Sequence, residues 1–107
     1  MSRKVNVGII GAGRIGRLHA EHLVYRVPDA NVLAVADIRL EAAQKCAAEF
    51  HIPSAVRDHR EIIENPDIEA VVICSSTDTH AQFIEEAAAA GKHIFCEKPI
   101  DFDLARI

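Results

Sequence analysis

Residues 5–16 read VNVGIIGAGRIG and combine an apolar run with three closely spaced glycines. The run from Lys4 to Ile10 carries few polar side chains, which is typical of a parallel strand buried on both faces. After the glycines, Arg14 to Arg26 has the apolar spacing of a helix. A strand, a glycine turn and a helix in this order predict a site where a helix N-terminus binds the pyrophosphate of a dinucleotide.

The three glycines are expected to have different roles at that site. Gly11 allows the tight turn, Gly13 lets the backbone approach the pyrophosphate, and Gly16 lets the helix pack closely. Phosphate oxygens would accept hydrogen bonds from the N–H groups of the first helical turn, where the helix dipole favours negative charge. Arg14 can add a cation there, and Ile15 belongs to the same turn. The alternative is a glycine turn that serves close packing alone.

A second apolar run, Asn31 to Asp37, ends in an acidic residue about twenty positions after the last glycine. A carboxylate at this place accepts hydrogen bonds from the adenosine ribose hydroxyls and repels a 2′-phosphate. The sequence therefore predicts NAD rather than NADP, with Ile38 in the same site. Arg39 complicates the preference, because a guanidinium accommodates a 2′-phosphate; it can equally be a solvated residue at a helix start.

Strands and helices continue to alternate along the rest of the chain. Pro53, Pro66 and Gly91 mark breaks between them. Further strands are expected at Ser54–Arg57, Ala70–Cys74 and His93–Cys96, and helices at Leu40–Phe50, from an Asp58 N-cap through Glu64, and from about Ala81 to Ala90. This alternation predicts one α/β domain over residues 1–107, a Rossmann-type doubly wound parallel sheet with strand order 3-2-1-4-5.

Composition narrows the function classes. The chain has 107 residues and a net charge of −4, and its basic residues form no cluster, which argues against nucleic-acid and anionic-membrane surfaces. No apolar run approaches the length of a membrane span, and the N-terminus lacks the apolar core of a signal peptide, so a cytoplasmic location is expected. Cys46, Cys74 and Cys96 are widely spaced and are expected to be buried free thiols.

Two polar segments follow predicted strands and would lie on the carboxyl rim, where such sheets bind ligands. One is SSTDTH, from Ser75 to His80, and the other is Glu97-Lys98-Pro99. Considered separately, the first is most simply a helix-capping loop with His80 in the first turn of the helix. An exposed Glu–Lys pair is usually solvated surface.

Together, GAGRIG, Asp37, SSTDTH and AGKHIFCEKP resemble the N-terminal half of the glucose-fructose oxidoreductase/inositol dehydrogenase/rhizopine-catabolism (Gfo/Idh/MocA) family over essentially the whole chain. The most specific part is Ala90 to Pro99, since the family has a characteristic E-K-P after this strand. SSTDTH is most similar to the inositol 2-dehydrogenases. Ser75, Ser76 and Thr77 depart from the T-P-N-x-x-H of many relatives.

The resemblance implies roles for residues on the rim. Ser75 to Thr77 and His80 would line the nicotinamide half of NAD, and Glu97 would lie near the nicotinamide ribose. Lys98 would reach both the cofactor and the substrate hydroxyl as the catalytic residue. A cation beside the reacting alcohol stabilises its alkoxide-like state as the hydride leaves.

The implied parent protein is an NAD-dependent dehydrogenase of a polyol or sugar, inositol-like, and a homo-oligomer. Family members continue into a sixth strand and a second domain that holds the substrate pocket and general base. We therefore expect this chain to be a fragment that binds NAD without turnover and self-associates, as a dimer, at the exposed strand His93–Cys96. The alternatives are a non-catalytic nucleotide-binding or redox-sensing module, and a lyase or hydrolase that uses bound NAD on the same fold.

The remaining polar residues suggest no further site. His19 and His22 have metal-ligand spacing but no third ligand nearby in the sequence, so no metal is predicted. His59 belongs to no recognisable constellation. Glu86 and Lys92 are expected to be solvated at a helix end.

Overall fold

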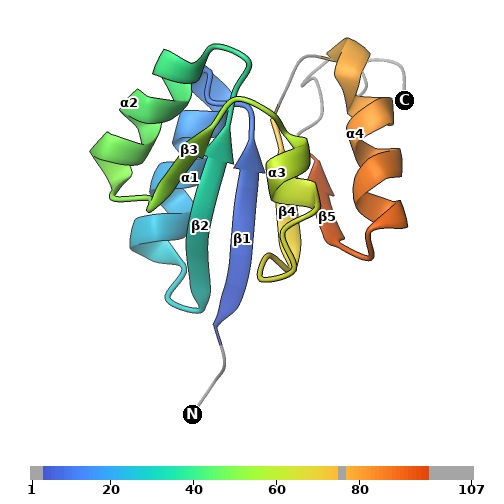
Figure 1. The fold of residues 1–107 in the computed structure, drawn as a ribbon. Coiled ribbons are helices and arrows are strands. Elements are labelled where there is room, and N and C mark those ends of the chain that lie inside the picture. Colours follow the sequence, from blue (N-terminus) through green and yellow to red (C-terminus); the bar gives the residue numbers. More distant parts are fainter. Residues whose placement is uncertain (1–3, 75–76, 97–107) are drawn as a thin grey trace, which may run out of the picture.

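The computed structural model describes residues 4–74 and 77–96 and shows strands and helices in strict alternation (Figure 1). In chain order the elements are β1 (Val5–Ile10), α1 (Arg14–Arg26), β2 (Ala30–Ala36), α2 (Leu40–Phe50), β3 (Ser54–Val56), α3 (Arg60–Ile63), β4 (Ala70–Ile73), α4 (Thr77–Ala89) and β5 (His93–Cys96).

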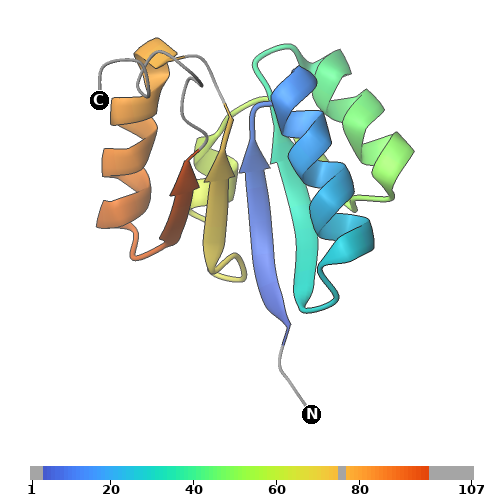
Figure 2. The same ribbon diagram turned by 180° about the vertical axis from the view of Figure 1, so that it is seen from behind.

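The strands form one parallel sheet in the order β3-β2-β1-β4-β5, which confirms the predicted Rossmann-type topology. The sheet is doubly wound: α1 and α2 cover β1, β2 and β3 on one face, and α3 and α4 cover the other (Figures 1 and 2). The carboxyl ends of β1, β2 and β3 therefore point to the same edge, at which the chain turns into α1, α2 and α3.

Each face of the sheet buries its own hydrophobic cluster. Val7, Ile9 and Val35 belong to the cluster beneath α1 and α2, whereas Ile10 and Val71 belong to the cluster beneath α3 and α4. All five side chains are below 9 % exposed. Burial on both sides explains why these strands lack the polar alternation of a half-exposed sheet.

Gly8 accounts for the close packing of α3 on β1. A Cβ atom at Gly8 would lie 2.5 Å from Ile62 Cγ2 and 3.1 Å from Ile68 Cδ1. Ile62 and Ile68 are almost fully buried. The missing side chain therefore provides the space that these two isoleucines fill.

Two predicted helix starts were wrong. α4 begins at Thr77, whereas the sequence pattern indicated about Ala81. The first turn of a helix tolerates polar residues well, so polarity does not distinguish it from a capping loop. The N-cap of α3 falls on His59, not Asp58; Asp58 Oδ1 nevertheless accepts a hydrogen bond from the Arg60 N–H at 2.9 Å.

The C-terminal end of α4 confirms the predicted glycine cap. Gly91 has φ +78°, in the left-handed region. Its N–H donates to the Ala88 carbonyl at 3.0 Å, and the Lys92 N–H donates to the Ala87 carbonyl at 3.0 Å. These two bonds form a Schellman motif, which glycine stabilises because it has no Cβ.

Within residues 4–74 and 77–96, no helix is long and apolar enough to cross a membrane. Of the three cysteines, Cys46 is fully buried in the cluster beneath α1 and α2, and burial raises the pKa of its thiol. Cys74 is a free thiol, as expected, but it is only partly buried and lines a groove described below, so its expected burial was wrong. The Cys96 side chain lies outside the described set.

Candidate cofactor-binding site

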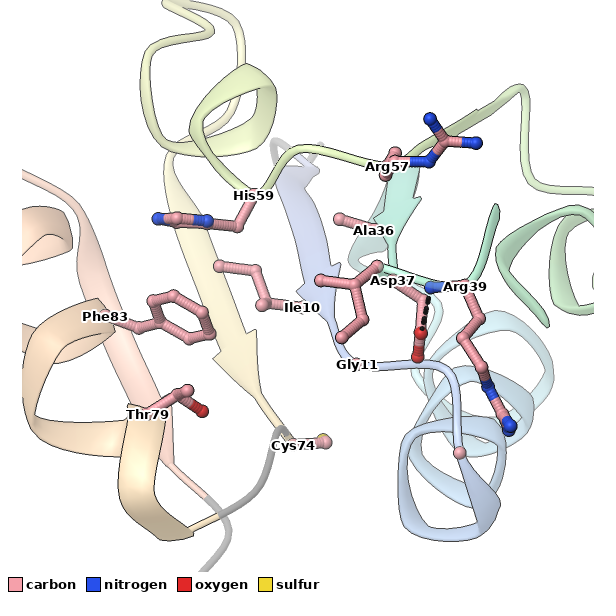
Figure 3. A pocket seen from close by; sticks show the side chains of 12 residues that line it. Ile10, Gly11, Ala36, Asp37, Arg39, Arg57, His59, Cys74, Thr79 and Phe83 are labelled. Carbon is pink, nitrogen blue, oxygen red and sulfur yellow. Dashed lines mark hydrogen bonds between the residues drawn. The ribbon is translucent and has the colours of Figure 1, made fainter. Parts of the chain in front are cut away.

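A groove of about 330 Å³ opens at the carboxyl edge of the sheet (Figure 3). It is formed by side chains and backbone at the carboxyl ends of β1, β2, β3 and β4 and in the first turns of α4. Its lining residues are Ile10, Gly11, Gly13, Ala36, Asp37, Ile38, Arg39, Arg57, His59, Cys74, Thr79 and Phe83.

The glycine turn forms the floor of this groove. Gly11 has φ +108°, a conformation that side chains rarely adopt, and its N–H donates to the Ala36 carbonyl at 2.7 Å. A Cβ at Gly13 would have no neighbour within 4 Å, so the groove is open there to a ligand. A Cβ at Gly16 would overlap the Gly11 carbonyl oxygen. Gly11 and Gly16 shape the turn, and Gly13 leaves room for a ligand beside the backbone.

The Asp37 carboxylate is held by two backbone N–H groups. Asp37 Oδ2 accepts from the Ala12 N–H at 2.8 Å, and Oδ1 accepts from the Arg39 N–H at 2.9 Å. The Asp37 N–H itself donates to the Val56 carbonyl at 3.1 Å. These bonds link the glycine turn to the loop after β2. Because a carboxylate has about four acceptor sites, Asp37 retains capacity for ribose hydroxyls.

The structure brings together part of the predicted site. Gly11, Gly13, Asp37, Ile38 and Arg39 line the same groove. Ile38 lines the groove with a side chain that is 84 % exposed.

Three other predicted residues that the structure describes do not line this groove. Arg14, Ile15 and Gly16 lie in the first turn of α1, whose N–H groups have no carbonyl partner within the helix. Thr77 and His80 lie in the first turns of α4, and their side chains are not described. Ser75, Ser76, Glu97 and Lys98 lie outside the described residues.

Among the groove residues that sequence reasoning missed are two with basic side chains, Arg57 and His59. Both follow β3 directly, at the same edge as Asp37. The rule that selected Asp37, namely a polar residue just after a parallel strand, could have selected them too. Because β3 has only three residues, its carboxyl end was a weak signal in the sequence.

His59 makes three contacts that its sequence neighbourhood did not predict. Its Nε2 lies 2.6 Å from Glu86 Oε1, its Nδ1 lies 3.7 Å from Asp58 Oδ1, and its ring centroid lies 4.1 Å from that of Phe83. Hydrogen bonds from Gln82 and then from His59 lower the pKa of Glu86. The Glu86 side chain is 33 % exposed, so it meets solvent as expected, but Gln82 and His59 also hold it in place.

These features fit a dinucleotide. The first turn of α1 offers N–H groups to a pyrophosphate, Gly13 leaves space beside them, and Asp37 presents a fixed acceptor to a ribose. A groove of this volume is of ligand-binding size. Among residues 4–74 and 77–96, no group of three or more His, Cys, Asp or Glu side chains could hold a metal ion. Fold and site together define a dinucleotide-binding Rossmann domain.

Comparison with known proteins identifies its family. The sequence profile of the oxidoreductase family with an NAD-binding Rossmann fold (GFO_IDH_MocA) matches residues 5–107. The chain therefore belongs to this family and is an NAD-binding oxidoreductase domain, as the resemblance implied.

Its relatives include inositol dehydrogenases. The chain is 50 % identical over 103 residues to an inositol 2-dehydrogenase of Rhizobium meliloti, covering 96 % of the chain and 30 % of that protein. It is 45 % identical over 104 residues to an uncharacterized oxidoreductase of Bacillus subtilis, covering 97 % of the chain and 30 % of that protein. The chain thus spans about 30 % of the length of these relatives.

A solved relative contains the cofactor. The structure of myo-inositol dehydrogenase from Lactobacillus casei in complex with NAD(H) and myo-inositol matches with a TM-score of 0.85 and 38 % identity. The match covers 91 % of this chain and 29 % of that one. NAD is the cofactor of this domain, because the family model that matches residues 5–107 describes an NAD-binding Rossmann fold.

Proposed function

We propose that this domain is the cofactor-binding part of a dehydrogenase that oxidises a secondary alcohol of an inositol-like polyol. The observation that carries the proposal is the Asp37 carboxylate, fixed by the Ala12 and Arg39 N–H groups beside the open backbone at Gly13. That geometry suits the ribose and pyrophosphate of NAD. The inositol dehydrogenases among the relatives support the substrate class.

In the proposed reaction a hydride passes from the carbinol carbon to NAD, and the hydroxyl proton passes to a general base, leaving a ketone. Bound NAD supplies the hydride acceptor. Asp37 and the first turn of α1 orient the cofactor in the groove, while Arg14 adds positive charge near the pyrophosphate. Ser75, Ser76, Thr77 and His80 would border the nicotinamide side.

Lys98 and Glu97 have proposed roles nearest the reaction. Lys98 would stabilise the developing alkoxide as the catalytic residue, and Glu97 would border the nicotinamide ribose. We propose that substrate binding and the general base belong to a second domain, beyond residues 1–107. This chain would then bind NAD without turnover.

Calorimetric titration of the chain with NAD tests the cofactor site. NAD at a hundredfold excess over its dissociation constant should stabilise the chain by about 2.7 kcal/mol. Absence of both heat of binding and thermal stabilisation with any dinucleotide would refute the proposal.

A second experiment tests the substrate class. The longest available form of the protein is incubated with NAD and either myo-inositol or scyllo-inositol, and the formation of NADH is measured. Lys98→Met should lose this activity.

A second copy of the chain is the proposed partner at β5. Phe95 is 56 % exposed, and β5 is an edge strand of the described sheet. An apolar groove of about 440 Å³ lies between β5 and α1. On this face of the sheet, no helix within the described residues covers β4 and β5 (Figure 2). Two such faces packed together would remove apolar surface from water.

A cytoplasmic location is also proposed. The buried Cys46 thiol is consistent with such a reducing compartment.

A further inference from the structure

Four side chains join the loop after β3 to α4 at one end of the cofactor groove. We call Asp58, His59, Phe83 and Glu86 the histidine cluster. The two ring nitrogens of His59 face carboxylates, Nε2 at 2.6 Å from Glu86 and Nδ1 at 3.7 Å from Asp58. Its ring lies against Phe83 with centroids 4.1 Å apart and planes inclined by 37°. The ring is therefore fixed at both edges and on one face.

This cluster borders the part of the groove that an adenine ring would occupy. The proposed function places the pyrophosphate beside Gly11 and Gly13 and the adenosine ribose on Asp37. The base attached to that ribose must then lie farther from the glycine turn. His59 and Phe83 line the groove on that far side, across from Asp37 (Figure 3).

The contact between His59 and Glu86 connects two elements that are distant in sequence. Twenty-seven positions separate the two residues. His59 belongs to the turn that starts α3, and Glu86 lies in the third turn of α4. Because Phe83 and Thr79 lie on the same helix, the contact fixes how closely that wall of the groove approaches the loop after β3.

Charge decides the strength of this connection. The lowered pKa of Glu86 keeps it ionised, so a protonated His59 donates a charge-assisted hydrogen bond between two full charges. The other charged groups described around the ring are Asp58, whose pKa is lowered by hydrogen bonds from Arg60, and Arg60 itself. A neutral His59 can still donate one N–H to Glu86, but the attraction between full charges is lost.

We propose that His59 is a positioning residue for the adenosine half of the cofactor and that its protonation tightens cofactor binding. The inference rests on the proposed function. The link between His59 and Glu86 holds α4 against the loop after β3, so the wall is ordered before the base arrives. Such preorganisation raises affinity because less motion is lost on binding. Deprotonation loosens the wall and lowers affinity for any ligand that carries the adenosine.

The test is calorimetric titration of the chain with NAD and with ADP-ribose across about pH 5.5 to 8.5, the interval in which histidine side chains lose their proton. For the wild type, both dissociation constants should rise about fivefold from the acid to the alkaline end of this range. The reason is that a hydrogen bond from a neutral histidine is weaker than one from a charged histidine. His59→Gln and Glu86→Gln should bind about fivefold more weakly at the acid end and show no slope. His22→Gln, an exposed histidine of α1, should keep the wild-type profile.

The possible results distinguish a failure of the proposed role of His59 from a failure of the proposed function. If the wild type binds neither NAD nor ADP-ribose, the proposed function fails and the inference fails with it. If NAD binds but both variants keep the wild-type affinity and slope, only the inference is overturned. A uniform weakening with an unchanged slope also overturns it, because that is the result of a purely structural contact. Should His59→Gln fail to fold by circular dichroism, the pH profile of Glu86→Gln decides.

Discussion

Gly13 and Gly16 stand three positions apart and have opposite reasons for being glycine. A side chain at Gly16 would overlap the Gly11 carbonyl oxygen, so the fold itself excludes it. At Gly13 a Cβ would meet nothing within 4 Å, and the backbone has φ −77°, which any residue adopts. Gly16 is thus required by packing, whereas Gly13 is required only if a ligand approaches the backbone.

Alanine substitutions at the two glycines should therefore separate stability from binding. Gly16→Ala should lower the free energy of unfolding by about 1–3 kcal/mol, because the helix must move away from the turn. Gly13→Ala should change it by less than about 0.5 kcal/mol and weaken NAD binding markedly. Urea denaturation and calorimetry measure the two effects. Equal loss of stability in both variants would contradict this assignment.

Asp37 is the residue on which cofactor choice depends. Asp37→Asn keeps the size of the side chain but removes the negative charge that repels a 2′-phosphate. NADP should then bind more tightly than to the wild type, and NAD more weakly, because the amide accepts at one atom only. Arg39 and Arg57 line the same groove and supply positive charge for that phosphate. An unchanged ratio of NAD to NADP affinity would show that Asp37 does not contact the ribose.

At the scale of elements, side chains join separate elements at both the amino and the carboxyl ends of the strands. At the amino edge, Lys92 Nζ donates to the carbonyl oxygens of Asn65, at 2.7 Å, and Ile68. The lysine joins the turn before β5 to the loop before β4, contrary to the expectation of a solvated Lys92. At the carboxyl edge, His59 and Glu86 make the corresponding connection.

Removing the Lys92 amine should destabilise the domain without affecting its site. Lys92→Met leaves two carbonyl groups without their charged donor and should lower the free energy of unfolding by about 1.5–3 kcal/mol. NAD affinity should stay at the wild-type value, because Lys92 lies at the edge opposite the glycine turn. Lys45→Met, on the exposed side of α2, is the control and should have little effect. Both quantities come from urea denaturation with and without NAD.

Element boundaries were predictable where side-chain chemistry differs sharply between neighbours. Gly91 marked the end of α4, and Pro53 and Pro66 marked the breaks after α2 and α3. The start of α4 was not predictable, since threonine and aspartate suit a first turn as well as a loop. His59 was missed for another reason: its partners Phe83 and Glu86 come from α4, more than twenty positions away.

At the scale of the whole molecule, the two faces of the sheet are covered unequally. Within the described residues, α1 and α2 cover β1 to β3, while β4 and β5 have no helix on that same face (Figure 2). Phe95 is 56 % exposed and lines the groove in this uncovered area. An exposed apolar face next to a strand edge is a typical contact surface between chains.

Replacing the aromatic residue at this face should weaken self-association. Phe95→Asp places a charge where a second copy would pack, so the dissociation constant of the proposed dimer should rise at least tenfold, about 1.4 kcal/mol. Light scattering across a concentration series measures the change. Tyr25→Asp, at a comparably exposed aromatic on α1, should leave the association intact. A wild-type chain that remains monomeric at high concentration would refute the proposed partner.

The sequence by itself determined the order of elements, the parallel sheet and the cofactor class. These depend on local signals in the sequence: apolar runs that form buried strands, glycines at fixed spacing, and the acidic residue Asp37 just after the second strand. Only the tertiary structure decided that Asp37 bonds to the Ala12 N–H and that His59 meets Glu86. Such contacts join residues more than twenty positions apart, and the packing of helices on the sheet, which no local pattern encodes, sets their distance.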